Sequence, residues 1–395
     1  MNITFEPQQC PKCAGLLLAA ALLAFSQGRV FAQVTGFETV PSGVYPSGSV
    51  LEGWSVTSNK VGIVTNPKGA YSGVNYLALT SGHIARTFAT QPGVVYQFEF
   101  YAKGPGLTDW WPGDSAANDI IGTNNGTLQN MTFDAGKVGQ AFTFNGDNSE
   151  VDFGPDVANF GTSDFTVDFW IKQPSSATVL TSILEKRHQC DSFVSFWDIR
   201  CGHVWNSPNS RPGQLFLENT ENGTARYAIL VANKAINDGV FHHAAFLRSG
   251  LTLAIYIDGV LDTNMTAPGI ANIFNSDLFK AGQNICVGTD GSNPFVGELD
   301  ELDVFNRALS PAEIDAIYRA GGDGKYSPVS TLLPNFQLTI GGVMTNTIVL
   351  TNAAGPWQLF TNSFAAKTSQ VTIEFEGNAL GVLFDNIQLI PAPGR

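Results

Sequence analysis

The chain has 395 residues and a formal net charge of −13. It carries no cluster of Lys and Arg able to follow a phosphate backbone, which argues against a nucleic-acid partner. Charged residues make up only 14% of the chain, whereas Gly, Pro and Phe number 41, 20 and 28. Such a composition is typical of β-sandwiches, and the length exceeds what a single core usually serves. We therefore expect an all-β protein of more than one domain.

Residues 1–32 have the features of a secretory signal peptide. Residues 14–25 form an apolar run too short to span a bilayer, and Val30-Phe31-Ala32 before Gln33 is a small-residue cleavage signal. No later stretch of the sequence is long and apolar enough for a membrane span. We expect a secreted protein, either extracellular or associated with the cell surface.

From Gln33 to about Gly106 the sequence alternates apolar and polar residues in short strand-like runs. The clearest example is residues 84–101, where two alternating runs are separated by Gln91-Pro92-Gly93. This pattern predicts a β-hairpin. At Asp109 the pattern changes to a stretch rich in Trp, Asn and Gly, which indicates a domain boundary.

The rest of the chain contains strand-like runs and one helix-like segment. The helix is predicted over residues 310–319, because Ser310 can cap it, Pro311 occupies the first helical position and Glu313 the third. The strands are predicted at residues 140–146, 164–172, 251–260, 295–305, 336–350, 357–364, 371–375 and 382–390.

A series of motifs runs from residue 109 to residue 326. In chain order they are WWPGDSAANDIIGTNNGTL, AFTFNG, DFTVDFWIK, FHHAAFLRSG, LTLAIYIDG and GELDELDVFNRALSPAEIDAIYRAGG. Together they resemble the laminin-G-like group of the concanavalin A-like superfamily, which is related to the pentraxins. The resemblance implies that residues 107–326 form a jelly-roll sandwich of two antiparallel sheets, closed at one end by the short helix.

The flanks carry shorter motifs of another kind. Upstream these are Gly53-Trp54, YLALTS and TFATQPGVVYQFEFYAKG, and downstream FTNSFAAKTSQVTIEFEG and FDNIQLI. They resemble the galactose-binding-like jelly rolls of secreted cell-wall-associated proteins. Neither flank has enough strands for a closed sandwich. We therefore expect one discontinuous jelly roll, residues 33–106 plus 327–395, that hosts the laminin-G-like unit as an insertion.

Removal of the leader leaves three cysteines, Cys190, Cys201 and Cys286. In an oxidising compartment Cys190 and Cys201 can close a small loop if they lie on paired strands of a hairpin, and this is the disulfide that we expect. Cys286 is then free or pairs elsewhere.

Calcium is the cofactor that the pentraxin resemblance implies. Asp191, after the ILEKRHQC strand, and Asp290, in the VGTDGSNPF loop, match positions of pentraxin calcium ligands. Ca²⁺ needs six or more oxygens, and this chain has a shorter loop with fewer acidic neighbours. An alternative acidic cluster, Asp114 with Asp119, is equally consistent with a solvated loop.

Two further groups of residues suggest chemistry but have structural explanations. Laminarinase-type glycosidases of the same superfamily place carboxylates as E-x-D-x-x-E, and Glu298, Asp300 and Asp303 approach this pattern with Asp in place of the last Glu. A non-catalytic closing strand fits this block better. His242-His243 matches a strand entry where one imidazole packs and forms hydrogen bonds.

The sequence as a whole indicates a secreted carbohydrate-binding or adhesive protein without catalytic activity, whose partners are glycans or extracellular polymers. Aromatic side chains can stack on sugar rings, and the candidates are Trp110, Trp111, Trp197 and Trp205, although core positions are favoured for them. Two alternatives remain. One is a structural protein-interaction module of the cell surface or extracellular matrix, and the other is a divergent glycoside hydrolase that uses Glu298 and Asp303.

Overall fold

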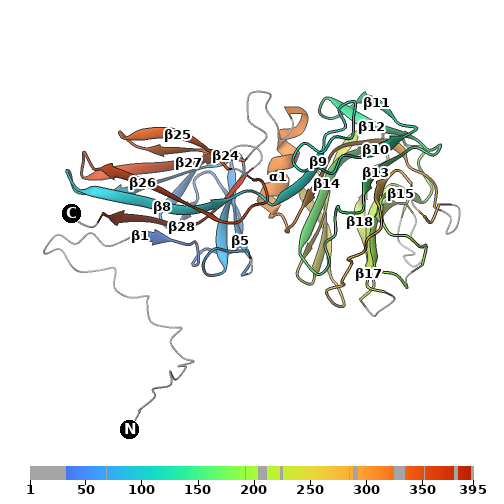
Figure 1. Cartoon of the computed structure of the whole chain (residues 1–395), viewed down its shortest axis with the longest axis horizontal. Helices are drawn as coiled ribbons and strands as arrows, with labels where there is room; N and C mark the ends of the chain where they lie inside the picture. Colours follow the sequence, from blue (N-terminus) through green and yellow to red (C-terminus); the bar gives the residue numbers. More distant parts are fainter. Residues whose placement is uncertain are drawn as a thin grey trace, which may run out of the picture.

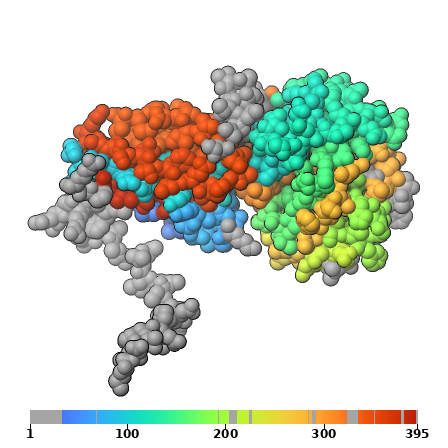
Figure 2. Space-filling model, in the orientation of Figure 1, coloured from blue at the N-terminus to red at the C-terminus, as the bar shows by residue number. Residues whose placement is uncertain are grey.

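The structure is a computed structural model that describes residues 33–392, apart from a set of internal positions. Those positions are 68, 192, 203–210, 223–225, 284, 288–291, 324–333, 351 and 378–380. The expected signal peptide therefore lies outside the described residues. The described chain forms two β-sandwiches side by side, with the helix α1 between them (Figure 1, Figure 2).

The first body, which we call the flank sandwich, is built from both ends of the described chain. One of its sheets has the strand order β2-β5-β6-β28-β8-β26, with β1 added against β28. The bounds of these strands are β1 Gln33–Thr35, β2 Gly43–Pro46, β5 Lys60–Thr65, β6 Asn75–Leu79, β8 Val95–Lys103, β26 Gln358–Ala365 and β28 Val382–Pro391.

The other sheet of the flank sandwich has the order β25-β24-β27-β7-β4-β3. Its strands are β3 Val50–Leu51, β4 Trp54–Ser58, β7 His83–Ala89, β24 Asn335–Ile340, β25 Met344–Val349 and β27 Gln370–Gly377. In both sheets, strands from before residue 104 pair with strands from after residue 334. Each flank thus completes the hydrogen bonding of the other.

The hairpin expected over residues 84–101 is not present. β7 pairs with β4 and β27, whereas β8 pairs with β26 and β28 in the opposite sheet. Both strands place alternate apolar residues in the same core, for example Phe88 from β7 and Phe98 from β8. Alternation predicts which face of a strand is buried but not which strand is its partner. The segment around Pro92 is therefore a corner between sheets.

The second body, the central sandwich, lies between the flanks in sequence. Its helix-side sheet has the order β11-β12-β23-β14-β19-β20-β21, with β9 paired to β23. The bounds are β9 Leu107–Trp111, β11 Thr132–Ala135, β12 Gln140–Asn145, β14 Phe165–Lys172, β19 Phe241–Ser249, β20 Thr252–Ile257, β21 Val260–Thr266 and β23 Val296–Phe305.

The second sheet of this body, the loop-side sheet, has the order β10-β13-β22-β15-β16-β17-β18. Its strands are β10 Thr127–Gln129, β13 Glu150–Gly154, β15 Thr181–Lys186, β16 Phe196–Cys201, β17 Gln214–Thr220, β18 Ala228–Ala235 and β22 Phe279–Ala281. Every pairing between these strands, as far as the structure describes them, is antiparallel, and the expected all-β fold class is confirmed.

Each sandwich has its own apolar core. Phe142, Phe169 and Phe246 of the helix-side sheet meet Trp197 and Leu217 of the loop-side sheet. The flank core contains none of these residues and is formed by other side chains, including Trp54 and Phe100. Separate cores mean that each sandwich buries its own alternating side chains, as stacked sheets require.

The helix α1 (Pro311–Ala320) has the start that the sequence predicts. The Ser310 side chain accepts a hydrogen bond from the Glu313 amide, and the Glu313 carboxylate accepts one from the Ser310 amide at 2.8 Å. Ile314 and Ile317 pack on the outer face of the helix-side sheet. Within the described residues no helix has the length and apolar character needed to cross a membrane.

The same helix contacts the flank sandwich. Lys60 of β5 donates to Asp315 at 2.8 Å. Gly62 of β5 lies so close to the helix start that an added Cβ would be 2.8 Å from the Ser310 hydroxyl. The two sandwiches are therefore joined by packing as well as by the chain.

Candidate functional site

The outer face of the loop-side sheet carries a row of charged side chains. Leu184, Trp197 and Leu217 point into the core, so their neighbours along each strand point outward. The register places the outward residues opposite one another from β13 to β17, and the row reads Asp152, Lys280, Glu185, Asp198 and Glu218. Glu185 and Asp198 of this row are buried, and charged residues are rarely buried unless they are paired.

Asp198 is the centre of this row and is fully buried. Its Oδ2 accepts hydrogen bonds from Arg187 at 2.9 Å and from Arg200 Nε at 3.0 Å. Arg187 also lies over the Phe196 ring, at 3.5 Å from the ring centre. The Oδ1 atom of Asp198 accepts no hydrogen bond from the described residues. Two guanidinium groups thus compensate the central carboxylate.

The two glutamates beside Asp198 have perturbed acidities. Burial raises the pKa of Glu185 to about 8, although the Ile285 amide, at 3.1 Å, acts in the opposite direction. Burial and the charge of Asp198 raise the pKa of Glu218 to about 7. Near neutral pH Glu185 is therefore mainly a neutral carboxylic acid that can donate as well as accept a hydrogen bond.

Glu185 makes stability depend on pH. Its pKa is about 8 in the folded protein against a reference value of 4.5, so the folded state binds more protons between these values and stability falls as pH rises through them. Glu185→Gln should remove this part of the slope, so it should gain stability relative to the wild type as pH rises from 4.5 to 9. Urea denaturation at pH 4.5, 7 and 9 measures the effect.

The matched control is Glu376→Gln, which removes an exposed carboxyl in β27. This control should not produce the gain in stability that we expect for Glu185→Gln at pH 9. If the free energy of unfolding of the wild type and of Glu185→Gln changed with pH by the same amount, the Glu185 carboxyl would have to be charged in the folded protein, against the prediction.

A cavity of about 500 Å³ lies on the same face, where β13, β22 and β15 meet. We call it the sheet hollow. Across it, Lys280 pairs with Glu150 at 3.0 Å, and His188 pairs with Asp277 at 2.7 Å. Glu185 forms part of its lining. The sheet hollow therefore presents donors and acceptors at fixed separations, with its charges largely paired.

A disulfide fixes the loops at the edge of the sheet hollow, and it differs from the one expected. Cys190 is bonded to Cys286, with 5.0 Å between their Cα atoms, and Cys201 is a buried free thiol. Cys190 lies in the loop between β15 and β16, whereas Cys201 lies opposite Thr181 at the far end of that hairpin. About four residues of extended strand, roughly 13 Å, separate them, which no disulfide can bridge.

The structure describes only one of the two residues proposed as calcium ligands. Asp191 lies beside the disulfide, where its Oδ1 accepts a hydrogen bond from the Phe193 amide at 2.8 Å and its Oδ2 one from Gln189. Asp290 lies outside the described residues. Across the described ranges, no three His, Cys, Asp or Glu side chains converge as a metal site would require. The donor set around Asp191 therefore does not fit Ca²⁺ by itself, and the calcium site stays a prediction.

The glycosidase-like block on β23 has little access to solvent. Asp303 is fully buried, and Glu298 is bonded to Lys172 at 2.9 Å. The cavity at the sheet hollow is on the other sheet and includes neither residue. Retaining hydrolysis needs two carboxyls that reach the substrate, so the burial of Asp303 and the pairing of Glu298 argue against the hydrolase alternative.

The paired histidines behave as the family position implies. His242 bridges two carboxylates, with Nδ1 2.9 Å from Asp258 and Nε2 3.1 Å from Asp238. His243 is fully buried against Trp170 and Tyr318. Both histidines are structural residues of the helix-side sheet.

Three of the four tryptophans considered for sugar stacking are buried, with exposures of 0–1% for Trp110, Trp111 and Trp197. Trp205 lies outside the described residues. Sequence reasoning missed Glu150, Glu185 and Lys280, which shape the sheet hollow. The signal was present in TSILEKR, where three consecutive charged residues follow Ile183 and Leu184. In the structure Glu185 and Lys186 are the last two residues of β15, all six residues of which are buried.

A model of the concanavalin A-like lectin/glucanases superfamily matches residues 145–315, which include most of the loop-side sheet. No curated protein is similar enough in sequence to count as a relative.

Solved structures align with part of the chain at low identity. One is the binding domain of Paraclostridial Mosquitocidal Protein 1, with 16% identity, a TM-score of 0.43, 54% of this chain and 52% of that chain covered. The chain thus spans about half the length of that structure. Another is domain 4 of an extracellular GH43 arabinanase from Geobacillus stearothermophilus, in complex with arabinotriose, with 21% identity, a TM-score of 0.42, and 54% and 97% covered.

A third solved structure is the binding domain of botulinum neurotoxin serotype D/C, with 12% identity, a TM-score of 0.43, and 63% and 64% of the two chains covered. The family match and the two packed antiparallel sheets agree on the central sandwich. Residues 145–315 thus match the concanavalin A-like lectin/glucanases superfamily, and the match lies within the central sandwich.

Proposed function

We propose that the protein is a secreted, non-catalytic carbohydrate-binding protein whose central sandwich binds a glycan in the sheet hollow. The observation that carries this proposal is the cavity of about 500 Å³ lined by the Glu150–Lys280 and His188–Asp277 pairs and by Glu185. A sugar hydroxyl donates and accepts at once, so it is best recognised by side chains that offer both functions in fixed positions.

Secretion is supported by the disulfide between Cys190 and Cys286, because such bonds persist mainly in oxidising compartments. The absence of catalysis is supported by the burial of Asp303 and the Glu298–Lys172 pair. The discontinuous galactose-binding-like domain remains part of the proposal. The shared sheets of the two flanks support it.

The proposal is tested with a glycan array probed with the wild type and with Glu150→Gln and Lys280→Met. Glu150→Gln replaces a charged acceptor in the wall of the sheet hollow with a neutral amide, and Lys280→Met removes an ammonium group from it. We expect binding at least tenfold weaker in each variant, which corresponds to about 1.4 kcal/mol. A parallel array in EDTA tests the calcium prediction, since a required ion would make binding chelator-sensitive.

Lys234→Met is the matched control. Lys234 lies near the end of β18 in the same sheet, is half exposed and pairs with Asp258 at 2.6 Å, away from the sheet hollow. It should bind like the wild type. A wild-type protein that binds no glycan would overturn the proposal and favour the structural interaction module, whereas release of reducing sugars from a bound polysaccharide would revive the hydrolase.

A further inference from the structure

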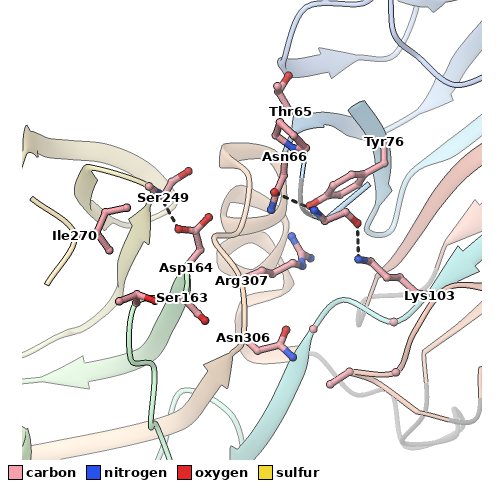
Figure 3. A pocket seen from close by; sticks show the side chains of 18 residues that line it. Thr65, Asn66, Tyr76, Lys103, Ser163, Asp164, Ser249, Ile270, Asn306 and Arg307 are labelled. Carbon is pink, nitrogen blue, oxygen red and sulfur yellow. Dashed lines mark hydrogen bonds between the residues drawn. The ribbon is translucent and has the colours of Figure 1, made fainter. Parts of the chain in front are cut away.

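A second cavity lies between the two sandwiches. Its volume is about 630 Å³, within the range of ligand-binding clefts, and residues of both bodies line it (Figure 3). Thr65 and Lys103 belong to the flank sandwich, Asp164 and Ser249 to the central sandwich, and Arg307 lies between them. We call this cavity the junction cleft.

The two cations of the junction cleft are already engaged. Arg307 donates to both oxygens of Glu313, to Oε2 at 3.0 Å, and also to the Pro105 carbonyl. Lys103 donates to the Gly69 carbonyl at 2.8 Å and lies 4.5 Å from the centre of the Trp357 ring. Arg307 could not bind a phosphate, sulfate or uronate without losing these partners. The Lys103 ammonium keeps two further N–H groups, but burial lowers its pKa to about 8 and so weakens its hold on an anion. The cleft is therefore poorly suited to an anionic ligand.

The rim of the junction cleft consists of short polar side chains. Thr65, Thr162, Ser163, Ser249 and Asn306 are all exposed and carry hydroxyl or amide groups. Among the described lining residues, Ile270, at 36% exposure, is the large aliphatic side chain open to solvent. Such a lining cannot bury an acyl chain, but it can exchange hydrogen bonds with many hydroxyl groups.

The walls are held in place before any ligand arrives. The Asp164 carboxylate accepts a hydrogen bond from the Gly250 amide at 2.7 Å. Arg248 donates to the Gly161 carbonyl at 2.7 Å and, through Nε, to the Ser163 carbonyl at 3.0 Å. On the opposite wall, Asn66 accepts from the Gly69 amide at 3.0 Å. A preformed wall reduces the entropy lost when a ligand binds.

We infer that the junction cleft is a second binding site, for a neutral oligosaccharide, formed jointly by the two sandwiches. Its hydroxyl and amide rim supplies the hydrogen bonds, and the Asp164 carboxylate is a strong acceptor for paired sugar hydroxyls. The inference is independent of the sheet hollow, which lies on the loop-side sheet and shares no lining residue with the cleft.

The experiment is calorimetric titration of the chain from Gln33 with cellotriose, laminaritriose, arabinotriose and galactotriose. Four proteins are compared with the wild type, namely Ser249→Trp, Asp164→Asn, Lys280→Met and Ser176→Trp. Ser249→Trp should fill the cleft, and Asp164→Asn should weaken an acceptor while keeping the oxygen that the Gly250 amide needs. Ser176→Trp adds the same ring at an exposed loop position outside the cleft.

We expect at least one trisaccharide whose affinity falls tenfold or more in Ser249→Trp, falls about threefold in Asp164→Asn, and is unchanged in Lys280→Met and Ser176→Trp. Binding that is sensitive to Lys280→Met but not to Ser249→Trp overturns this inference and leaves the sheet hollow standing. The expected result supports the cleft whatever the outcome at the sheet hollow, which is tested by whether any other sugar loses affinity in Lys280→Met. No binding of any of the four sugars overturns the inference.

Discussion

Replacing Arg307 by methionine is expected to lower the free energy of unfolding by about 3–5 kcal/mol. Arg307 is 6% exposed and pairs with Glu313, which is 3% exposed and also caps α1. Without the guanidinium, Glu313 is a buried carboxylate lacking its cation, and the Pro105 carbonyl loses a donor. Urea denaturation at pH 7 measures the change in the free energy of unfolding. The substitution should also weaken the attachment of one sandwich to the other.

A second variant separates loss of the pair from loss of a side chain. In Arg307→Met with Glu313→Gln the buried charge is removed and Gln can still complete the capping box, so most of the lost stability should return. Arg319→Met, at an exposed arginine of the same helix, should change stability by less than about 1 kcal/mol. If the double variant were no more stable than Arg307→Met, the proposed importance of the Arg307–Glu313 ion pair would be contradicted.

Removing the disulfide with Cys190→Ser and Cys286→Ser is expected to cost about 2–4 kcal/mol. The bond connects positions 96 residues apart, so it restricts a long loop of the unfolded chain. It also ties together the two loops that border the sheet hollow, so glycan binding there should weaken together with stability. Thermal unfolding with and without dithiothreitol measures the first effect, and the reductant should leave the double variant unchanged.

Cys201→Ala provides the control for this prediction. The Cys201 thiol is 2% exposed, and burial raises its pKa to about 12, so it is an unreactive thiol of the core. The Cys201→Ala variant should still unfold at a lower temperature when dithiothreitol is present, as the wild type does. Peptide mapping without reduction should recover Cys190 linked to Cys286, and a Cys190–Cys201 peptide would contradict the structure.

The two proposed glycan sites differ in the side chains that line them. Ion pairs and a neutral Glu185 line the sheet hollow, whereas in the junction cleft the cations are held by protein groups and hydroxyl groups form the rim. Both cavities offer hydrogen-bond donors and acceptors, and in both the charged groups are bound to protein groups or neutral, so the electrostatic field is weak. This combination suits uncharged sugars. Separate loss of the two activities in Lys280→Met and Ser249→Trp would establish two sites on one chain.

The sequence by itself determined what each strand buries. Period-2 alternation identified β8, apolar strand-like runs identified β14 and β23, the capping box identified α1, and the motif order identified the central sandwich. These features depend on side-chain direction and local hydrogen bonds, which neighbouring residues decide.

Only the tertiary structure decided which strands and side chains meet. Alternation at residues 84–101 is the same for a hairpin and for a corner between sheets, and three cysteines allow three pairings of which only geometry selects Cys190–Cys286. The row from Lys280 to Glu218 likewise arises from register between strands that lie far apart in the chain. Contacts of this kind depend on how the sheets stack and close, and no local pattern records that.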